Sequence, residues 1–157
     1  MTRQLIEEGS IAPDFTLPRD GGTFVTLSQI RPGKAVLFFY PKDNTPTCTL
    51  EAQDFSAAAP DFAKAGVTVI GISKDSVKSH DRFCAKHGLQ VILASDEAGT
   101  TCEDYGIWGE KRLYGRTYDG IHRTTVLIDG AGRVARVWDG VKVKGHVDEV
   151  LAAARAL

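Results

Sequence analysis

Two nearly unbroken apolar runs, separated by a helical segment, constrain the fold of this chain more than any other feature. The runs cover residues 35–40 (AVLFFY) and 67–73 (VTVIGIS), and each has the length and composition of a strand that is buried on both faces. Between them, residues 48–64 place Phe55 and Phe62 on one helical face, which indicates an amphipathic helix. Alternation of strand, helix and strand is typical of an α/β domain.

The remaining elements complete that plan. We expect further strands over residues 12–17, 22–27, 91–94, 124–128 and 134–138, and further helices over residues 76–87, from residue 100, and over residues 146–157. Pro60 predicts a kink or a break in the long helix. Residues 106–123 show no clear period and predict a long loop that is functional or mobile. Residues 1–157 are therefore expected to form a single α/β domain, a three-layer α/β/α arrangement with a mixed sheet and an N-terminal β-hairpin.

Composition and charge narrow the possible functions. The formal net charge of −1 and the scattered basic residues argue against a nucleic-acid partner. No stretch is long and apolar enough for a membrane span, and the first residues do not resemble a secretion signal. Three cysteines in such a chain fit a reducing compartment better than a disulfide framework. We therefore expect a cytoplasmic protein without a membrane or nucleic-acid partner.

One of those cysteines lies where a sulfur is chemically poised. Thr45 has the properties of a helix N-cap and Pro46 those of the first helical residue, which makes Cys48 the third residue of the helix. The unpaired amide groups and the positive end of the helix dipole favour an anion at that point. The segment also follows the carboxyl end of a central strand, where open α/β sheets place their sites. Because cysteine reacts as the thiolate, Cys48 is the candidate nucleophile.

At these residues the chain resembles a known family. Residues 40–49 (YPKDNTPTCT) are similar to the active-site signature of the peroxiredoxins, and most of all to the PrxQ class, also called bacterioferritin comigratory proteins. Residues 12–17 (APDFTL) and 120–129 (GIHRTTVLID) resemble the same class. The resemblance runs from about residue 9 to the end, and it implies a thioredoxin-like fold with an N-terminal extension.

The resemblance also implies a chemistry. Cys48 would be the peroxidatic cysteine of a thiol-dependent peroxidase that reduces hydrogen peroxide and organic hydroperoxides, and it would become a sulfenic acid. The hydroxyl of Thr45 would lie near the sulfur, Arg123 would stabilise the thiolate and the developing charge, and Pro41 would shield the site from water. No metal, haem or flavin is required. A dithiol donor such as thioredoxin would recycle the enzyme, and a monomer is the usual state of the class, although some members dimerise.

The chain departs from the class at the second cysteine. Many PrxQ proteins carry a resolving cysteine five residues after the first, where this chain has Gln53. Another branch places it on the helix that here contains Cys84, so the resemblance implies that Cys84 resolves Cys48 and that the helix around Cys48 unwinds to allow it. Cys102 is expected to be an ordinary buried cysteine, with a resolving or back-up role as the alternative.

Several alternatives remain open. The chain could be a one-cysteine peroxidase, a slow redox sensor that acts through mixed disulfides, or a thioredoxin-like binding module without chemistry. Glu51 could hold Arg123 or lie in solvent. His80, Cys84 and His87 could share one helix face as a zinc site, but no fourth ligand is evident, so we expect the two histidines to be solvated or capping.

Overall fold

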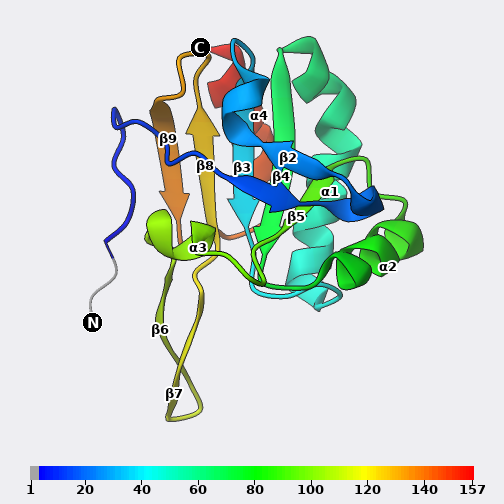
Figure 1. The fold of residues 1–157 in the computed structure, drawn as a ribbon, viewed down its shortest axis with the longest axis vertical. Helices are drawn as coiled ribbons and strands as arrows, with labels where there is room; N and C mark the ends of the chain where they lie inside the picture. The colour runs from blue at the N-terminus through cyan, green and yellow to red at the C-terminus, as the bar shows by residue number, and fades with distance from the viewer. Residues whose placement is uncertain (1–3) are drawn as a thin grey trace.

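The computed structural model describes residues 4–157, and its centre is a five-stranded sheet with the strand order β5-β4-β3-β8-β9 (Figure 1). The strands are β3 (Lys34–Phe39), β4 (Val67–Ser73), β5 (Ile92–Ser95), β8 (Thr124–Ile128) and β9 (Val134–Asp139). Strand β4 runs parallel to β3 and β5, whereas β8 runs antiparallel to β3 and β9. The sheet is therefore mixed, as predicted.

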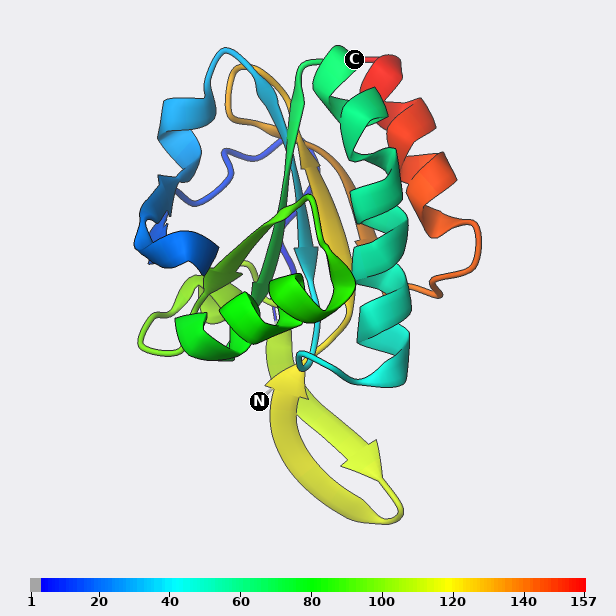
Figure 2. The ribbon, with the colours of Figure 1, turned by 90° about the vertical axis from the view of Figure 1, so that its right-hand side faces the viewer.

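Helices cover one face of this sheet. Helix α1 (Pro46–Lys64) lies beside α4 (His146–Arg155), and α2 (Val77–His87) packs near β5 (Figure 2). The other face is covered by a strand pair, β1 (Thr16–Pro18) and β2 (Phe24–Thr26), together with the short α3 (Thr101–Asp104). The fold thus has three layers, but strands and turns supply much of the third layer.

Alternate side chains of β3 enter two separate apolar cores. Val36 and Phe38 pack beneath α1 and α4 in a helix-side core that also contains Cys48. Leu37 and Phe39 pack in a hairpin-side core beneath β1 and β2. The β3 side chains from Ala35 to Phe39 are buried in both directions, which explains why this part of the strand has a continuous apolar sequence.

The N-terminal hairpin is shorter than predicted. Its register pairs Thr16 with Thr26 and Pro18 with Phe24, and the three-residue 3-10 turn η1 (Asp20–Gly22) lies between the strands. The chain before it runs along the β8–β9 turn instead, where the amide of Ala12 donates to the carbonyl of Gly132 at 2.9 Å. Residues 9–12 therefore pair with residues 132–134 instead of lengthening the hairpin.

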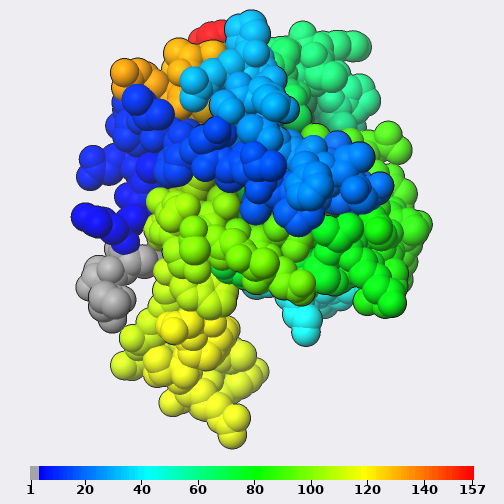
Figure 3. Space-filling view, in the orientation of Figure 1, coloured from blue at the N-terminus to red at the C-terminus, as the bar shows by residue number. Residues whose placement is uncertain are grey.

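The predicted loop over residues 106–123 is wrong. The segment forms an antiparallel hairpin of β6 (Trp108–Leu113) and β7 (Arg116–Ile121), which projects from the body of the molecule (Figures 2 and 3). Tyr114 and Gly115 form the turn, with φ of 51° and 76°. Two positive φ angles match the right-handed twist of a hairpin, but tyrosine at the first position is not a recognised turn signal.

Helix α1 continues through Pro60 as one element, so of the predicted kink or break, the break is absent. Phe55 and Phe62, on either side of the proline, are fully buried with ring centroids 6.0 Å apart. This packing holds both halves of the helix on the sheet and outweighs the missing hydrogen bond. Helix α2 ends as predicted, with Gly88 in the left-handed conformation (φ 58°). Among the described helices, none is apolar over enough of its length to span a membrane.

Candidate active site

Cys48 lies in the first turn of α1, on the inner face of the helix. Thr45 is the N-cap with φ of −87° and ψ of 153°, and Pro46 is the first helical residue, as predicted. The side chain of Cys48 is only 1% exposed and packs in the helix-side core. The helix therefore aims the sulfur inward, against the end of the sheet, and not into solvent.

Arg123 and Glu51 complete a charged group around this sulfur. The guanidinium of Arg123 donates from Nη2 to Cys48 Sγ at 3.2 Å and from Nη1 to Glu51 Oε1 at 2.7 Å. Arg123 lies just before β8, while Cys48 and Glu51 lie one turn apart on α1. The structure thus decides the open question about Glu51: it is buried and holds the arginine.

Burial governs the electrostatics of this group. Burial raises the pKa of Glu51 to about 7, against the opposing effect of Arg123. Its Oε2 atom has no hydrogen-bond partner among the described residues. For Arg123, burial opposes the charge, but Glu51 and the sulfur of Cys48 raise the pKa above its ordinary value. Arg123 is therefore a permanent cation fixed between a carboxyl group and a thiol.

Thr45, the residue before α1, makes a different contact from the one expected. The hydroxyl of Thr45 donates to the carbonyl of Lys42 at 2.9 Å, and the described residues show no hydrogen bond between that hydroxyl and the sulfur. It thereby stabilises the turn that leads into α1. Pro41 follows the β3 segment and is half-buried.

Cys84 lies on α2, a different helix, and is half-buried. Burial raises its pKa to about 12, and the carboxylates of Asp20, Asp43 and Asp81 act in the same direction. In this conformation the side chain is a protonated thiol and a poor nucleophile. All three cysteines of the chain are free thiols here.

Cys102 lies on α3 and is fully buried in the hairpin-side core. The sheet separates it from Cys48, which lies in the helix-side core. Burial raises the pKa of its thiol, as does the neighbouring carboxylate of Asp96. The position agrees with the expected structural role.

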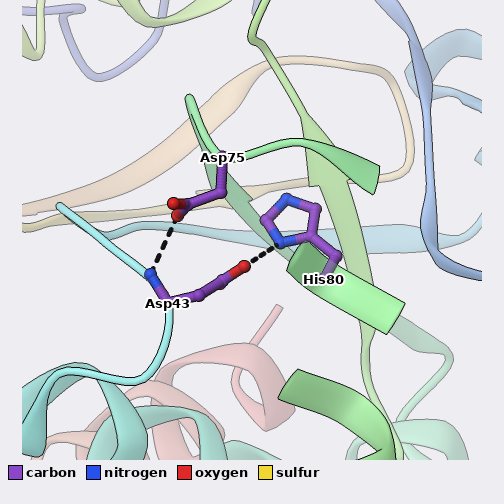
Figure 4. A group of neighbouring side chains, drawn as sticks. All are labelled: Asp43, Asp75 and His80. Carbon is purple, nitrogen blue, oxygen red and sulfur yellow. Dashed lines mark hydrogen bonds and ion pairs between the residues drawn. The ribbon is translucent and has the colours of Figure 1, made fainter. Parts of the chain in front are cut away.

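A second buried polar cluster involves Asp43 of the active-site loop (residues 40–45, between β3 and α1) and was missed from sequence (Figure 4). His80 Nδ1 lies 2.7 Å from Asp43 Oδ2, and His80 Nε2 lies 3.0 Å from the carbonyl oxygen of Ala94. The amide of Asp43 donates to Asp75 Oδ2 at 2.8 Å. The prediction that His80 is solvated or capping is therefore wrong, because the side chain is fully buried. One signal was available: Phe83, one helical turn along α2, is a core residue on the same face.

Among the described residues, His80, Cys84 and His87 do not come together as a metal site. His80 directs its nitrogens at Asp43 and Ala94, whereas His87 directs its nitrogens at Gln53 (3.4 Å) and Asn44 (3.3 Å). Over residues 4–157, the ligand atoms of Asp43, Asp75 and His80 form one group that is compact enough for a metal ion. These atoms already have partners, because Asp43 Oδ2 contacts His80 Nδ1, and Asp75 Oδ2 accepts from the Asp43 amide and the Ser73 hydroxyl, so the group is a structural network.

Comparison with known proteins gives consistent results. A model of the AhpC/TSA family matches residues 9–137. The peroxiredoxin Bcp of Xanthomonas campestris is 45% identical over 156 residues (99% of this chain and 98% of that protein), and that of Escherichia coli K12 is 42% identical over 146 residues (93% and 94%). A solved structure of the Xanthomonas campestris bacterioferritin comigratory protein, from work on its alkyl peroxide reduction activity, has a TM-score of 0.89 and 43% identity. The match covers 96% of this chain and 98% of the chain in that structure.

Proposed function

Because the chain belongs to the AhpC/TSA family and is a thiol-dependent peroxidase of the peroxiredoxin Bcp (PrxQ) type, we propose that Cys48 is its peroxidatic cysteine and Cys84 its resolving cysteine. The chain has the thioredoxin-like fold of that class. One observation carries the first assignment: the guanidinium of Arg123 lies 3.2 Å from Cys48 Sγ at the start of a helix. Neither of the other cysteines has a cation in hydrogen-bond contact with its sulfur in the described part of the chain.

The first step follows from this geometry. The Cys48 thiolate attacks one oxygen of the hydroperoxide, the O–O bond breaks, and a sulfur–oxygen bond forms. The sulfur loses two electrons, and the departing oxygen gains them and leaves as water or an alcohol once it is protonated. Arg123 faces the charge that moves from sulfur to oxygen, which is where a fixed donor stabilises a transition state most.

We assign supporting roles to two further residues. Thr45 fixes the turn before α1 through its hydrogen bond to Lys42, so it holds the helix start and thereby the sulfur. Pro41 stands where the chain leaves the β3 segment, and its ring excludes water from the loop. Both are positioning roles, because neither side chain has a hydrogen bond to the sulfur among the described residues.

In the second step, the Cys84 sulfur displaces hydroxide from the Cys48 sulfenic acid. A disulfide forms, and the hydroxide and the thiol proton leave as water. We propose that thioredoxin or a similar dithiol then reduces this disulfide, that the substrates are hydrogen peroxide and organic hydroperoxides, and that the chain acts as a monomer. The support is the peroxiredoxin relatives, the alkyl peroxide reduction activity named for the Xanthomonas campestris protein, and the half-buried Cys84 on a neighbouring helix.

Peptide mapping tests both assignments. Reduced protein is treated with one equivalent of hydrogen peroxide, digested without reductant and analysed by mass spectrometry. We expect a peptide pair joined through Cys48 and Cys84, and no consumption of peroxide by the Cys48→Ser variant. If Cys84→Ser turns over with thioredoxin as fast as the parent, the chain is a one-cysteine enzyme and the resolving role of Cys84 is wrong.

A further inference from the structure

The two histidines that flank Cys84 both hold α2 to the chain around Cys48. His80 contacts Asp43, five residues before Cys48, at 2.7 Å. His87 lies 3.3 Å from Asn44 Oδ1 and so holds the neighbouring loop residue. Cys84 lies between the two histidines on the same helix, so the proposed resolving thiol is on the helix that these contacts hold to the active-site loop.

The Asp43–His80 contact is the buried one of these two connections between α2 and the loop. The side chains of His80 and Asp43 are 0% and 3% exposed. Both carboxylate oxygens of Asp43 are engaged, since Tyr40 donates to Oδ1 at 2.6 Å, and Ser79 and His80 contact Oδ2. The main chain of Asp43 is held as well, by the carboxylate of Asp75. The loop cannot leave α2 without breaking this set of contacts.

The hydrogen bonds of His80 and Asp43 stabilise the contact only while the two side chains keep their present arrangement. Both ring nitrogens of His80 lie within hydrogen-bond distance of oxygen atoms, Asp43 Oδ2 at 2.7 Å and the Ala94 carbonyl at 3.0 Å. Both side chains are buried, so either partner left alone is a costly unsatisfied polar group. Such a pair favours two discrete arrangements, closed or fully released, over intermediate ones.

We propose that the Asp43–His80 pair is a latch that sets the balance between oxidation of Cys48 and its resolution by Cys84. Closed, the latch keeps the start of α1 folded, with Cys48 beneath Arg123. Open, it releases the active-site loop and α2 together. A disulfide needs Cα atoms within about 7 Å, which two intact helices do not readily provide, so both segments must loosen for the sulfurs to meet. The latch rests on the proposed resolving role of Cys84, and His80 acts through Asp43 as a positioning residue.

Two substitutions of His80 separate the latch from general stability. Asparagine places an amide donor near the position of Nδ1 and keeps the contact with Asp43, whereas glutamine places it near Nε2 and keeps only the contact with Ala94. His146→Asn is the matched control, because His146 is another buried histidine, with Nε2 2.8 Å from Thr125 Oγ1, and lies on α4 away from the loop.

The experiment follows both chemical steps in the full chain. Reduced protein is mixed with hydrogen peroxide in a quench-flow instrument, and Cys48 sulfenic acid and the Cys48–Cys84 disulfide are quantified by mass spectrometry. In His80→Gln we expect the disulfide to form about tenfold faster, the factor that one net hydrogen bond contributes, and sulfenic acid to form more slowly. His80→Asn should stay close to the parent, and His146→Asn should leave the ratio of the two rates unchanged. Equal changes of that ratio in His80→Gln and His146→Asn would overturn the latch.

A second measurement is independent of Cys84. In the reduced protein, hydrogen exchange of the His80→Gln variant should quicken together in peptides that cover residues 46–52 and 77–88. Faster exchange confined to residues 77–88 would overturn the latch even if no disulfide forms. If the parent protein yields no Cys48–Cys84 peptide but the two segments loosen together, the resolving assignment fails and the coupling of the segments stands.

Discussion

Arg123 Nη2 lies 3.2 Å from Cys48 Sγ, although 75 residues separate the two along the chain. The contact exists because β8 pairs with β3, whose end leads into the loop before α1. The same guanidinium holds the buried Glu51 at 2.7 Å. The cation is therefore fixed before substrate arrives, and no reorganisation is needed when charge moves off the sulfur.

Replacing Arg123 should impair the first chemical step. In Arg123→Lys the charge remains, but the planar fork that reaches sulfur and carboxylate together is lost. We expect the second-order rate constant of Cys48 with hydrogen peroxide to fall by about 100-fold, as for loss of one preorganised donor. Stopped-flow measurement of peroxide consumption gives this rate. The control is Arg136→Lys, since Arg136 forms an exposed pair with Glu149 at 3.4 Å. An unchanged rate in Arg123→Lys would refute the role of Arg123.

Glu51 should make the protein less stable as the pH rises from 4.5 to 7. Burial raises its pKa to about 7 from 4.5, so in this range the folded state holds a proton that the unfolded state has released. The free energy of unfolding then falls with increasing pH, by about 3 kcal/mol in total from this group. Urea unfolding at several pH values checks this. Glu51→Gln has no proton to release and should flatten the curve; parallel curves for the two proteins would contradict the prediction.

Cys84 should resist alkylation in the folded, reduced protein. Burial raises its pKa to about 12, with Asp20, Asp43 and Asp81 adding to the effect, so little thiolate is present at pH 8. We expect iodoacetamide to modify Cys84 at least about tenfold more slowly in native than in urea-unfolded protein. Peptide mass spectrometry over time provides both rates in one sample. Equal rates would mean that α2 does not protect the thiol.

Cys102→Ser should leave turnover intact and lower stability. The side chain is fully buried in the hairpin-side core beside the Asp96 carboxylate, and the smaller, more polar hydroxyl loses packing there at a cost of about 1–3 kcal/mol. Steady-state peroxidase assays and urea unfolding on the same preparation separate the two effects. Cys48→Ser is the comparison, and its activity should be abolished. A large loss of turnover in Cys102→Ser at unchanged stability would assign Cys102 a chemical role.

Local signals and the family resemblance predicted the part of the site that lies close together in sequence. Thr45, Pro46 and Cys48 form one helix start, and its geometry follows from cap and proline preferences. Arg123 was implied only by the resemblance, because nothing in its own neighbourhood distinguishes it from a surface arginine. Glu51 stayed open, since helical spacing fixes the direction of a side chain but not its partner.

The misjudged features depend on contacts or backbone angles that the sequence does not display. His80 is buried because Asp43, 37 residues earlier, and Ala94, 14 residues later, both offer it acceptors. The β6–β7 hairpin depends on Tyr114 adopting a positive φ, which few residues of its kind do. Pro60 stays within one helix because tertiary packing outweighs its local cost.

The division of the interior by the sheet has a consequence for engineering. Substitutions in the hairpin-side core and substitutions in the helix-side core alter separate sets of side chains. Their effects on stability should then be additive to within about 0.5 kcal/mol. Thermal stability can thus be raised by repacking the hairpin-side core around Leu37 and Phe39 while the surroundings of the reactive thiol stay unchanged. An enzyme with a single continuous core does not have this freedom.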